Sequence, residues 1–131
     1  MKISEAVAWL FQRGVRTGPY GLDRIKFILE ELENPHQDYA CVLIGGTNGK
    51  GSVTAVTESI MACCPDYVTG SLTSPHLVDI RERAKIAARP LADKYWINGV
   101  KKMQEVCKVL DKEASLGPAS FFETEIGRAH V

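Results

Sequence analysis

The sequence predicts an α/β protein with a parallel sheet, and three observations support this fold class. Residues 39–44 form a short apolar run typical of a buried strand, and a glycine-rich turn follows it. Residues 53–61 then have the composition of a helix. Residues 67–72 predict a second strand, which we expect to lie parallel to the first because a helical crossover joins them.

Two amphipathic helices are predicted before the first strand. Apolar residues recur at helical spacing over 2–13 and again over 22–33. A segment rich in glycine and proline, residues 13–21, separates them, and Pro35 ends the second helix.

The region after the second strand is predicted to be mainly helical. Residues 81–86 are expected to form a short strand or an extended segment, and a long amphipathic helix is predicted over 91–114. Ser120 and Glu123 are three residues apart, which is typical of a capping box at the start of a further helix.

The composition indicates one modest globular domain. The chain has 131 residues, of which 45% are hydrophobic, and its sixteen basic residues balance its sixteen acidic residues. Such a balance does not favour a nucleic-acid partner or a basic membrane anchor. No apolar run reaches the ~18 residues of a membrane span, and no signal peptide is visible, so a cytoplasmic protein is expected.

The four cysteines do not predict a metal site. Cys63 and Cys64 are adjacent, Cys41 and Cys107 are isolated, and no CxxC pair occurs. We therefore expect four reduced thiols.

The turn after the first predicted strand has the chemistry of a phosphate-binding loop. Its glycines allow several backbone N–H groups to point inward, and the following helix adds the positive end of its dipole. Lys50 supplies a positive charge for the outer phosphates, and Ser52 supplies a hydroxyl for a phosphate or for Mg²⁺. The residues expected to bind the phosphates are Gly46, Thr47, Asn48, Gly49, Lys50, Gly51 and Ser52.

A second polar loop follows the second predicted strand. It contains Ser74 and His76, and Glu82 and Arg83 come shortly afterwards. Because ligands lie beyond the carboxyl ends of parallel strands, we expect this loop to share a crevice with the glycine-rich loop. Ser74 is also a typical turn residue before proline, His76 is also explained by packing, and the Glu82-Arg83 pair is also explained as a solvated charge pair.

The sequence GTNGKGS resembles the ATP-binding loop of the Mur ligase superfamily, most closely that of the folylpolyglutamate and dihydrofolate synthases. It departs from the common nucleotide loop in that Gly51 separates Lys50 from Ser52. The later pattern TSPHL followed by Glu82-Arg83 is similar to the same family, as are the segment Gly21-Leu22-Asp23-Arg24-Ile25 and the segment Ser120-Phe121-Phe122-Glu123. The resemblance runs from about residue 10 to residue 123 and implies part of a Mur-ligase-like ATPase domain.

The resemblance also implies roles for individual residues. Lys50 is expected to be catalytic, the loop from Gly46 to Ser52 to bind ATP, and Ser74 to ligate Mg²⁺. Two segments of the resemblance have an equally good structural explanation. Residues 19–25 are also explained as a turn that leads into a helix cap, and residues 120–123 as a capping box. The residues implied to contact the pterin or pteroate are Pro19, Tyr20, Ser120, Phe121, Phe122 and Glu123.

The family reaction is ATP-dependent ligation of L-glutamate to a folate or dihydropteroate carboxylate through an acyl phosphate. The resemblance therefore implies ATP, Mg²⁺ and small-molecule substrates, with a monomeric full-length enzyme. A Mur-type peptidoglycan ligase and a non-catalytic nucleotide-binding module are the alternatives.

The last six residues suggest that the chain is a fragment. Residues 126–131 back-translate to a sequence like the start of a common sequencing adapter. We therefore expect residues 1–125 to be the N-terminal part of an ATP-binding ligase domain, residues 126–131 to be a non-native tail, and the isolated chain to be inactive.

Overall fold

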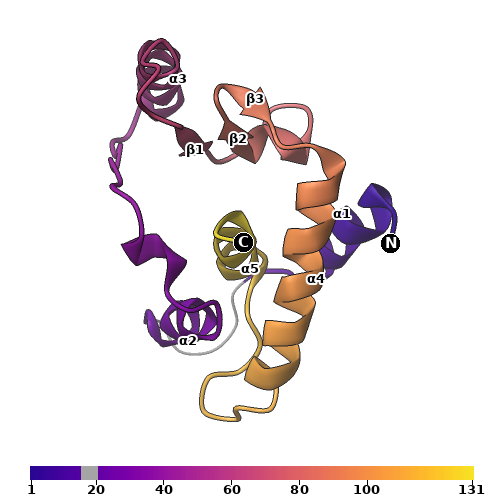
Figure 1. Cartoon of the computed structure of the whole chain (residues 1–131). Helices are drawn as coiled ribbons and strands as arrows, with labels where there is room; N and C mark the ends of the chain where they lie inside the picture. Colours follow the sequence, from indigo (N-terminus) through magenta and orange to yellow (C-terminus); the bar gives the residue numbers. More distant parts are fainter. Residues whose placement is uncertain (16–20) are drawn as a thin grey trace. The chain divides into compact units, whose positions relative to one another are not determined.

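The chain folds into two compact units (Figure 1), and the computed structural model describes residues 1–15 and 21–131. The first unit comprises Met1–Ala40 and Asp93–Val131. The second unit comprises Cys41–Ala92 and carries the glycine-rich loop.

The first unit is helical. The predicted helices at both ends of the chain are confirmed, with boundaries that differ by a few residues at most. A short 3₁₀-helix, Pro35–Gln37, follows the second of them. The α-helices of this unit are α1 (Ile3–Gln12), α2 (Asp23–Glu31), α4 (Asp93–Leu110) and α5 (Phe121–Ala129).

Helix α4 lies at the centre of the first unit and packs against α1, α2 and α5. Its buried positions include Trp96, Val100, Met103 and Leu110, whose spacing of three, four and seven residues places them on one face of the helix. Full burial of each large apolar side chain contributes roughly 1.5–3 kcal/mol. The core cluster consists of Ile28, Met103, Val106, Cys107, Leu110 and Ala119.

The predicted capping box at the start of α5 is confirmed. Ser120 is the N-cap residue, and its hydroxyl accepts a hydrogen bond from the Glu123 amide while the Glu123 carboxylate accepts one from the Ser120 amide. These two hydrogen bonds satisfy backbone N–H groups at the start of the helix, which have no acceptor within the helix itself.

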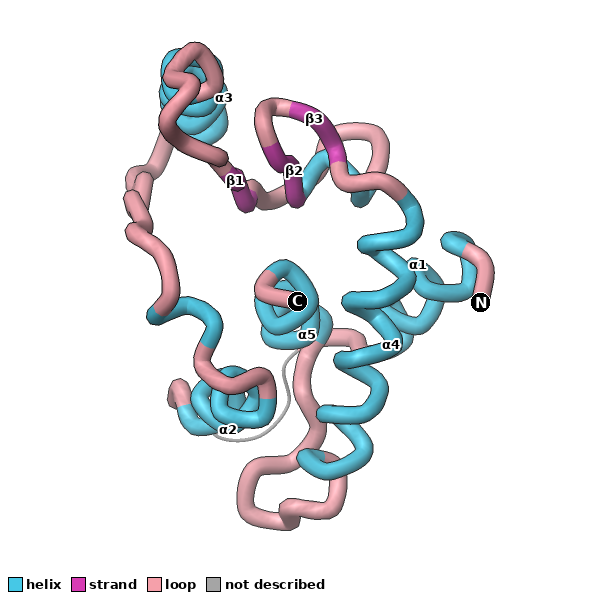
Figure 2. Tube along the Cα trace, in the orientation of Figure 1, coloured by secondary structure: helices cyan, strands magenta, loops and turns pink. Residues whose placement is uncertain are grey.

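The second unit combines one long helix with a small sheet. Helix α3 (Lys50–Met61) confirms the helix predicted after the glycine-rich loop. A 3₁₀-helix, Ile80–Arg83, precedes the second strand. Figure 2 shows how short the strands are; they are β1 (Gly70–Leu72), β2 (Ala84–Ile86) and β3 (Arg89–Pro90).

The prediction of a parallel sheet is wrong for the described residues. The sheet has the order β1-β2-β3 with antiparallel pairing throughout, and Gly70 lies opposite Ile86. The predicted strand at 39–44 is not formed, and Val42 and Leu43 are 78% and 92% exposed. A parallel strand needs hydrogen-bonding neighbours and cover on both faces, which no described residue supplies here. The second predicted strand pairs instead with β2, which is closer along the chain.

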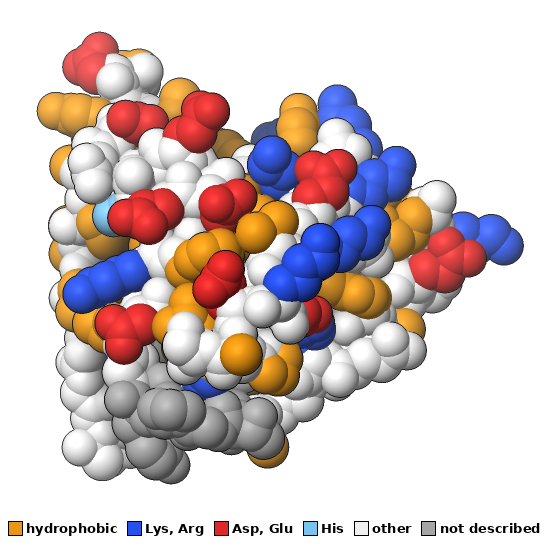
Figure 3. Space-filling model, turned by 90° about the horizontal axis from the view of Figure 1, so that it is seen from below, with side chains coloured by type: hydrophobic (Ala, Val, Ile, Leu, Met, Phe, Trp, Pro, Cys, Tyr) orange, Lys and Arg blue, Asp and Glu red, His pale blue; other side chains and the backbone are white. Residues whose placement is uncertain are grey.

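The surface carries charges of both signs. On the face drawn in Figure 3, basic and acidic side chains are interspersed with hydrophobic ones. Among the described residues, no helix has both the length and the apolar character needed to cross a bilayer.

Candidate functional site

The glycine-rich loop leads directly into α3. Gly49 is the N-cap residue and has φ +78°, a left-handed conformation that glycine adopts without the strain of a side chain. Gly46 also has a positive φ, of +145°. The first residue of α3 is Lys50, so the positive end of the helix dipole lies at the loop. Such a glycine turn before a helix N-terminus is suited to an anion.

The Lys50 side chain folds back over this loop. Its Nζ atom donates hydrogen bonds to the carbonyl oxygens of Gly46 and Thr47. The loop residues from Gly45 to Val53 are all exposed. The ammonium group is therefore held next to the backbone that would receive a phosphate, and a bound anion would compete with the two carbonyls for it.

The loop that contains Ser74 is held by Glu82. The Glu82 carboxylate accepts hydrogen bonds from three successive backbone amides, those of Leu77 (2.8 Å), Val78 (3.1 Å) and Asp79 (2.9 Å). The amides of Leu77 and Asp79 are the main reason that the pKa of Glu82 is lowered. Glu82 thus organises the loop, a role that the sequence did not indicate.

Arg83 has a partner of its own in the same loop. It is buried, and its Nε atom donates a hydrogen bond of 2.9 Å to Nδ1 of His76. Nδ1 of His76 is the acceptor in this hydrogen bond. The charged pair that the sequence left open as a surface feature thus binds residues 76–79, which follow Ser74 in this loop.

Ser74 supplies at most part of a magnesium site. Its side chain is exposed, and a hydroxyl is a hard oxygen donor of the kind that Mg²⁺ accepts. Within residues 1–15 and 21–131, no group of three or more His, Cys, Asp or Glu side chains is arranged to hold a metal ion. The described residues therefore fit a metal only as a minor contributor to its ligands, beside phosphates and water.

In the first unit, an open apolar pocket of about 460 Å³ gathers most of the residues implied to bind the pterin. The rings of Phe11 and Phe121 stack with centroids 5.2 Å apart and an interplanar angle of 9°. Aromatic faces of this kind are suited to a flat heterocycle. The lining residues are Phe11, Gly14, Val15, Ser120, Phe121, Phe122 and Glu123. The other two predicted pterin contacts, Pro19 and Tyr20, lie outside the described residues.

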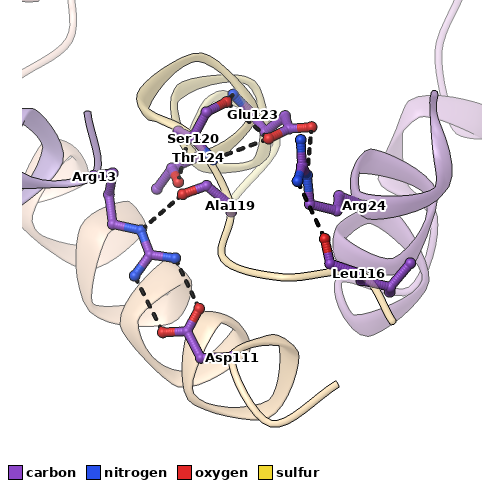
Figure 4. A network of polar contacts seen from close by, with 8 residues as sticks. All are labelled: Arg13, Arg24, Asp111, Leu116, Ala119, Ser120, Glu123 and Thr124. Carbon is purple, nitrogen blue, oxygen red and sulfur yellow. Dashed lines mark hydrogen bonds and ion pairs between the residues drawn. The ribbon is translucent and has the colours of Figure 1, made fainter. Parts of the chain in front are cut away.

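A buried ion pair fixes one wall of this pocket (Figure 4). Glu123 accepts hydrogen bonds from the Ser120 hydroxyl at 2.7 Å and from Nε of Arg24 at 3.1 Å. Burial alone would raise the pKa of Glu123, but the hydrogen bonds from Ser120 and Arg24 outweigh it and the pKa is lowered. Arg24 also donates to the Leu116 carbonyl oxygen. The carboxylate therefore stays ionised and holds α2 against the start of α5.

The sequence did not predict two long-range ion pairs or one buried carboxylate. Arg24 stood in a recognised segment, but nothing in the sequence linked it to Glu123, 99 residues away. Arg13 similarly forms an ion pair with Asp111 and donates to the Ala119 carbonyl oxygen, which places the turn before α5 (Figure 4). A buried carboxylate on α3, Glu58, was also missed, since its neighbours Thr57 and Ser59 in the sequence are polar.

Comparison with known proteins identifies the relationship. No family model matches the sequence. The dihydrofolate synthase/folylpolyglutamate synthase of Bacillus subtilis is 30% identical over 120 residues, which are 89% of this chain. The crystal structure of folylpolyglutamate synthase from Thermotoga maritima matches 98% of this chain with a TM-score of 0.85 and 35% identity. The chain is homologous to part of the folylpolyglutamate and dihydrofolate synthases.

The match covers only a part of these synthases. The chain spans 27% of the length of the Bacillus subtilis relative and 29% of the Thermotoga maritima chain. A further solved structure, a folylpolyglutamate synthase complex with AMPPCP and folate, matches 99% of this chain and has 32% of its own length covered, with a TM-score of 0.86 and 27% identity. The fold of the chain is therefore that of the corresponding part of these synthases.

Proposed function

We propose that this chain supplies the phosphate-binding loop and part of the pterin pocket of an ATP-dependent folate ligase. The observation that carries the proposal is the left-handed Gly49 at the N-terminus of α3, immediately before Lys50. In a synthase of this family, that geometry presents backbone amides, a helix dipole and an ammonium group to the same anion. The match to a synthase structure that contains AMPPCP and folate supports this ligand assignment.

The proposed reaction joins L-glutamate to the carboxylate of a folate or dihydropteroate. A carboxylate oxygen attacks the γ-phosphorus of ATP, the bond to the bridging oxygen breaks, and ADP leaves. The glutamate amine then attacks the acyl carbon, loses a proton, and releases inorganic phosphate as the amide forms. Positioning and charge neutralisation are the main needs of such a phosphoryl transfer.

Each part of the chain has a role in this proposal. The loop from Gly46 to Ser52 binds the phosphates, and Lys50 moves from its carbonyl partners to neutralise charge that develops on the transferred group. Phe121 and Phe122 contact the pterin, while the Arg24–Glu123 pair keeps that wall in place. Mg²⁺, when bound, would reduce the negative charge of the phosphates, and Ser74 would supply one oxygen to it.

We further propose that residues 1–125 are the N-terminal part of an ATP-binding domain within a longer, monomeric cytoplasmic enzyme. In this proposal residues 126–131 are a non-native tail, although residues 126–129 continue α5 without a break. Genomic sequence at this locus tests the tail directly. A reading frame that continues through these six codons in genomic DNA contradicts it, and a divergence after residue 125 supports it.

The experiment that tests the function uses the complete reading frame, called the parent protein below. We expect the parent protein to add glutamate to folate or dihydropteroate only when ATP is present, and the isolated 131-residue chain to show no such activity. Lys50→Ala in the parent protein is expected to abolish turnover while the unfolding temperature stays unchanged, because the Lys50 side chain is exposed. Near-normal turnover by that variant would refute the assignment.

A further inference from the structure

Helix α3 has one buried residue among its otherwise exposed or half-exposed positions, and that residue is an acid. Glu58 is 6% exposed. Carboxylates are rarely buried unless charged or polar groups compensate the loss of water. The environment of Glu58 therefore calls for an explanation beyond helix packing.

The two oxygens of Glu58 hold the two strands of a hairpin. Oε1 accepts a hydrogen bond of 2.6 Å from the Ser71 hydroxyl, and Oε2 lies 3.5 Å from Nζ of Lys85. Ser71 belongs to β1 and Lys85 to β2, and the two residues are directly opposite each other in the strand register. Residues so paired share one face of the sheet. A single carboxylate from α3 thus joins a cross-strand pair.

These elements lead to the two loops of the candidate nucleotide site. Helix α3 begins at Lys50, so Glu58 lies two turns, roughly 12 Å, from the phosphate loop along one rigid helix. Strand β1 ends at Leu72, two residues before Ser74. The contact between Glu58 and the hairpin therefore connects the element that carries the phosphate loop to the element that carries Ser74.

We propose that Glu58 is a positioning residue for nucleotide binding: with Ser71 and Lys85 it sets the placement of the phosphate loop relative to the Ser74 loop. This inference rests on the proposed function, because it takes both loops to contact the same nucleotide. Glu58 touches no reacting atom in it. A shift of one loop by about 1 Å is enough to reduce the rate of a positioned reaction about 100-fold.

The test compares variants of the parent protein in steady-state kinetics, AMPPCP calorimetry and thermal unfolding. Glu58→Ala removes both contacts, Glu58→Gln keeps an oxygen for Ser71 but loses the charge, and Lys85→Met removes the opposite partner. Ser59→Ala is the matched control, because Ser59 is the exposed neighbour on α3 and its hydroxyl donates to the Ala55 carbonyl of the same helix.

If Glu58 is a positioning residue, its substitution should weaken the binding of nucleotide more than the binding of folate. Glu58→Ala should raise KM for ATP and Kd for AMPPCP about tenfold or more, while KM for the folate substrate changes less than about twofold. Glu58→Gln and Lys85→Met should each raise KM for ATP and Kd for AMPPCP by a smaller factor. The factor for the double variant should be less than the product of the two single factors, because both substitutions remove the same interaction between Glu58 and Lys85. Ser59→Ala should match the unaltered protein in every measurement.

Two results would overturn the inference, and they are distinguishable from failure of the proposed function. Unchanged AMPPCP affinity in Glu58→Ala contradicts it, and so does an equal loss for both substrates that follows the fall in unfolding temperature. If Glu58→Ala does not fold, Glu58→Gln and Lys85→Met decide by the same criteria. If the unaltered protein neither binds AMPPCP nor ligates glutamate, the proposed function and this inference both fail.

Discussion

The buried ion pair between Arg24 and Glu123 gives the sharpest stability prediction. Arg24 is 3% exposed and Glu123 is 7% exposed, so neither charge is well solvated. Glu123→Ala leaves the Arg24 guanidinium without its carboxylate and removes the reciprocal half of the capping box. Removal of one partner of a buried pair costs about 3–5 kcal/mol. We expect the free energy of unfolding of the first unit to fall by that amount.

Urea unfolding followed by tryptophan fluorescence measures this change. Both tryptophans, Trp9 and Trp96, belong to the first unit, so the signal reports that unit alone. With a slope of about 2 kcal/mol per M of urea, the expected loss moves the midpoint down by about 1.5–2.5 M. Glu105→Ala is the matched control, because it breaks an exposed ion pair with Lys102, and exposed pairs contribute about 0–1 kcal/mol.

The dependence of stability on pH gives a second readout at the same position, with the further variant Glu123→Gln. The folded pKa of Glu123 lies below its ordinary value of 4.5, so ionisation of Glu123 stabilises the fold above that pH. This contribution is lost as the pH falls below 4.5 and through the folded pKa. The stability difference between the unaltered chain and Glu123→Gln should therefore be constant near neutral pH and shrink in acid. Two results together would refute this prediction. The free energy of unfolding would fall no more in Glu123→Ala than in Glu105→Ala, and the stability difference between the unaltered chain and Glu123→Gln would stay the same in acid.

Three further predictions concern the loops and the pocket. The Arg81 guanidinium beside Asp79 lowers the pKa of that carboxyl to about 2; Arg81→Ala should return it toward 3.8, and a carboxyl NMR titration that shows no rise would contradict this. Gly49→Val should cost about 1–2 kcal/mol at the left-handed position and weaken AMPPCP binding by the parent protein in calorimetry, whereas unchanged affinity would count against the loop assignment. Phe121→Ala removes a pocket ring proposed to contact the pterin, so folate affinity of the parent protein should fall by about 0.5–1.5 kcal/mol, the amount that an aromatic pair contributes beyond its buried area, and an unaffected Kd would place the pterin elsewhere.

The sequence predicted the helices well because their signals are local. The apolar stripe of α4 and the Ser120–Glu123 capping box each depend on residues within a few turns of one another. The helix after the glycine-rich loop was also predicted, although it begins at Lys50, three residues before the predicted start at residue 53. These features need no knowledge of the rest of the fold.

The sheet and the polar contacts depend on partners that the sequence pattern cannot identify. Residues 39–44 have the composition of a buried strand, but a strand exists only where another strand pairs with it. Glu82 and Arg83 form a charged pair in the sequence, yet in the structure Glu82 binds backbone amides and Arg83 binds His76. The pairing of Arg24 with Glu123 likewise arises only when α2 and α5 pack together.

The central claim is that the backbone from Gly46 to Ser52 holds the phosphates of ATP, and a crystal structure of the parent protein with AMPPCP tests it most directly. We predict that the β- and γ-phosphate oxygens lie about 2.7–3.2 Å from the amides at the start of α3. We also predict that Nζ of Lys50 leaves the Gly46 carbonyl oxygen, to which it donates in the present structure, and contacts a phosphate. Phosphates bound elsewhere, with Lys50 still on the Gly46 carbonyl, would contradict the account.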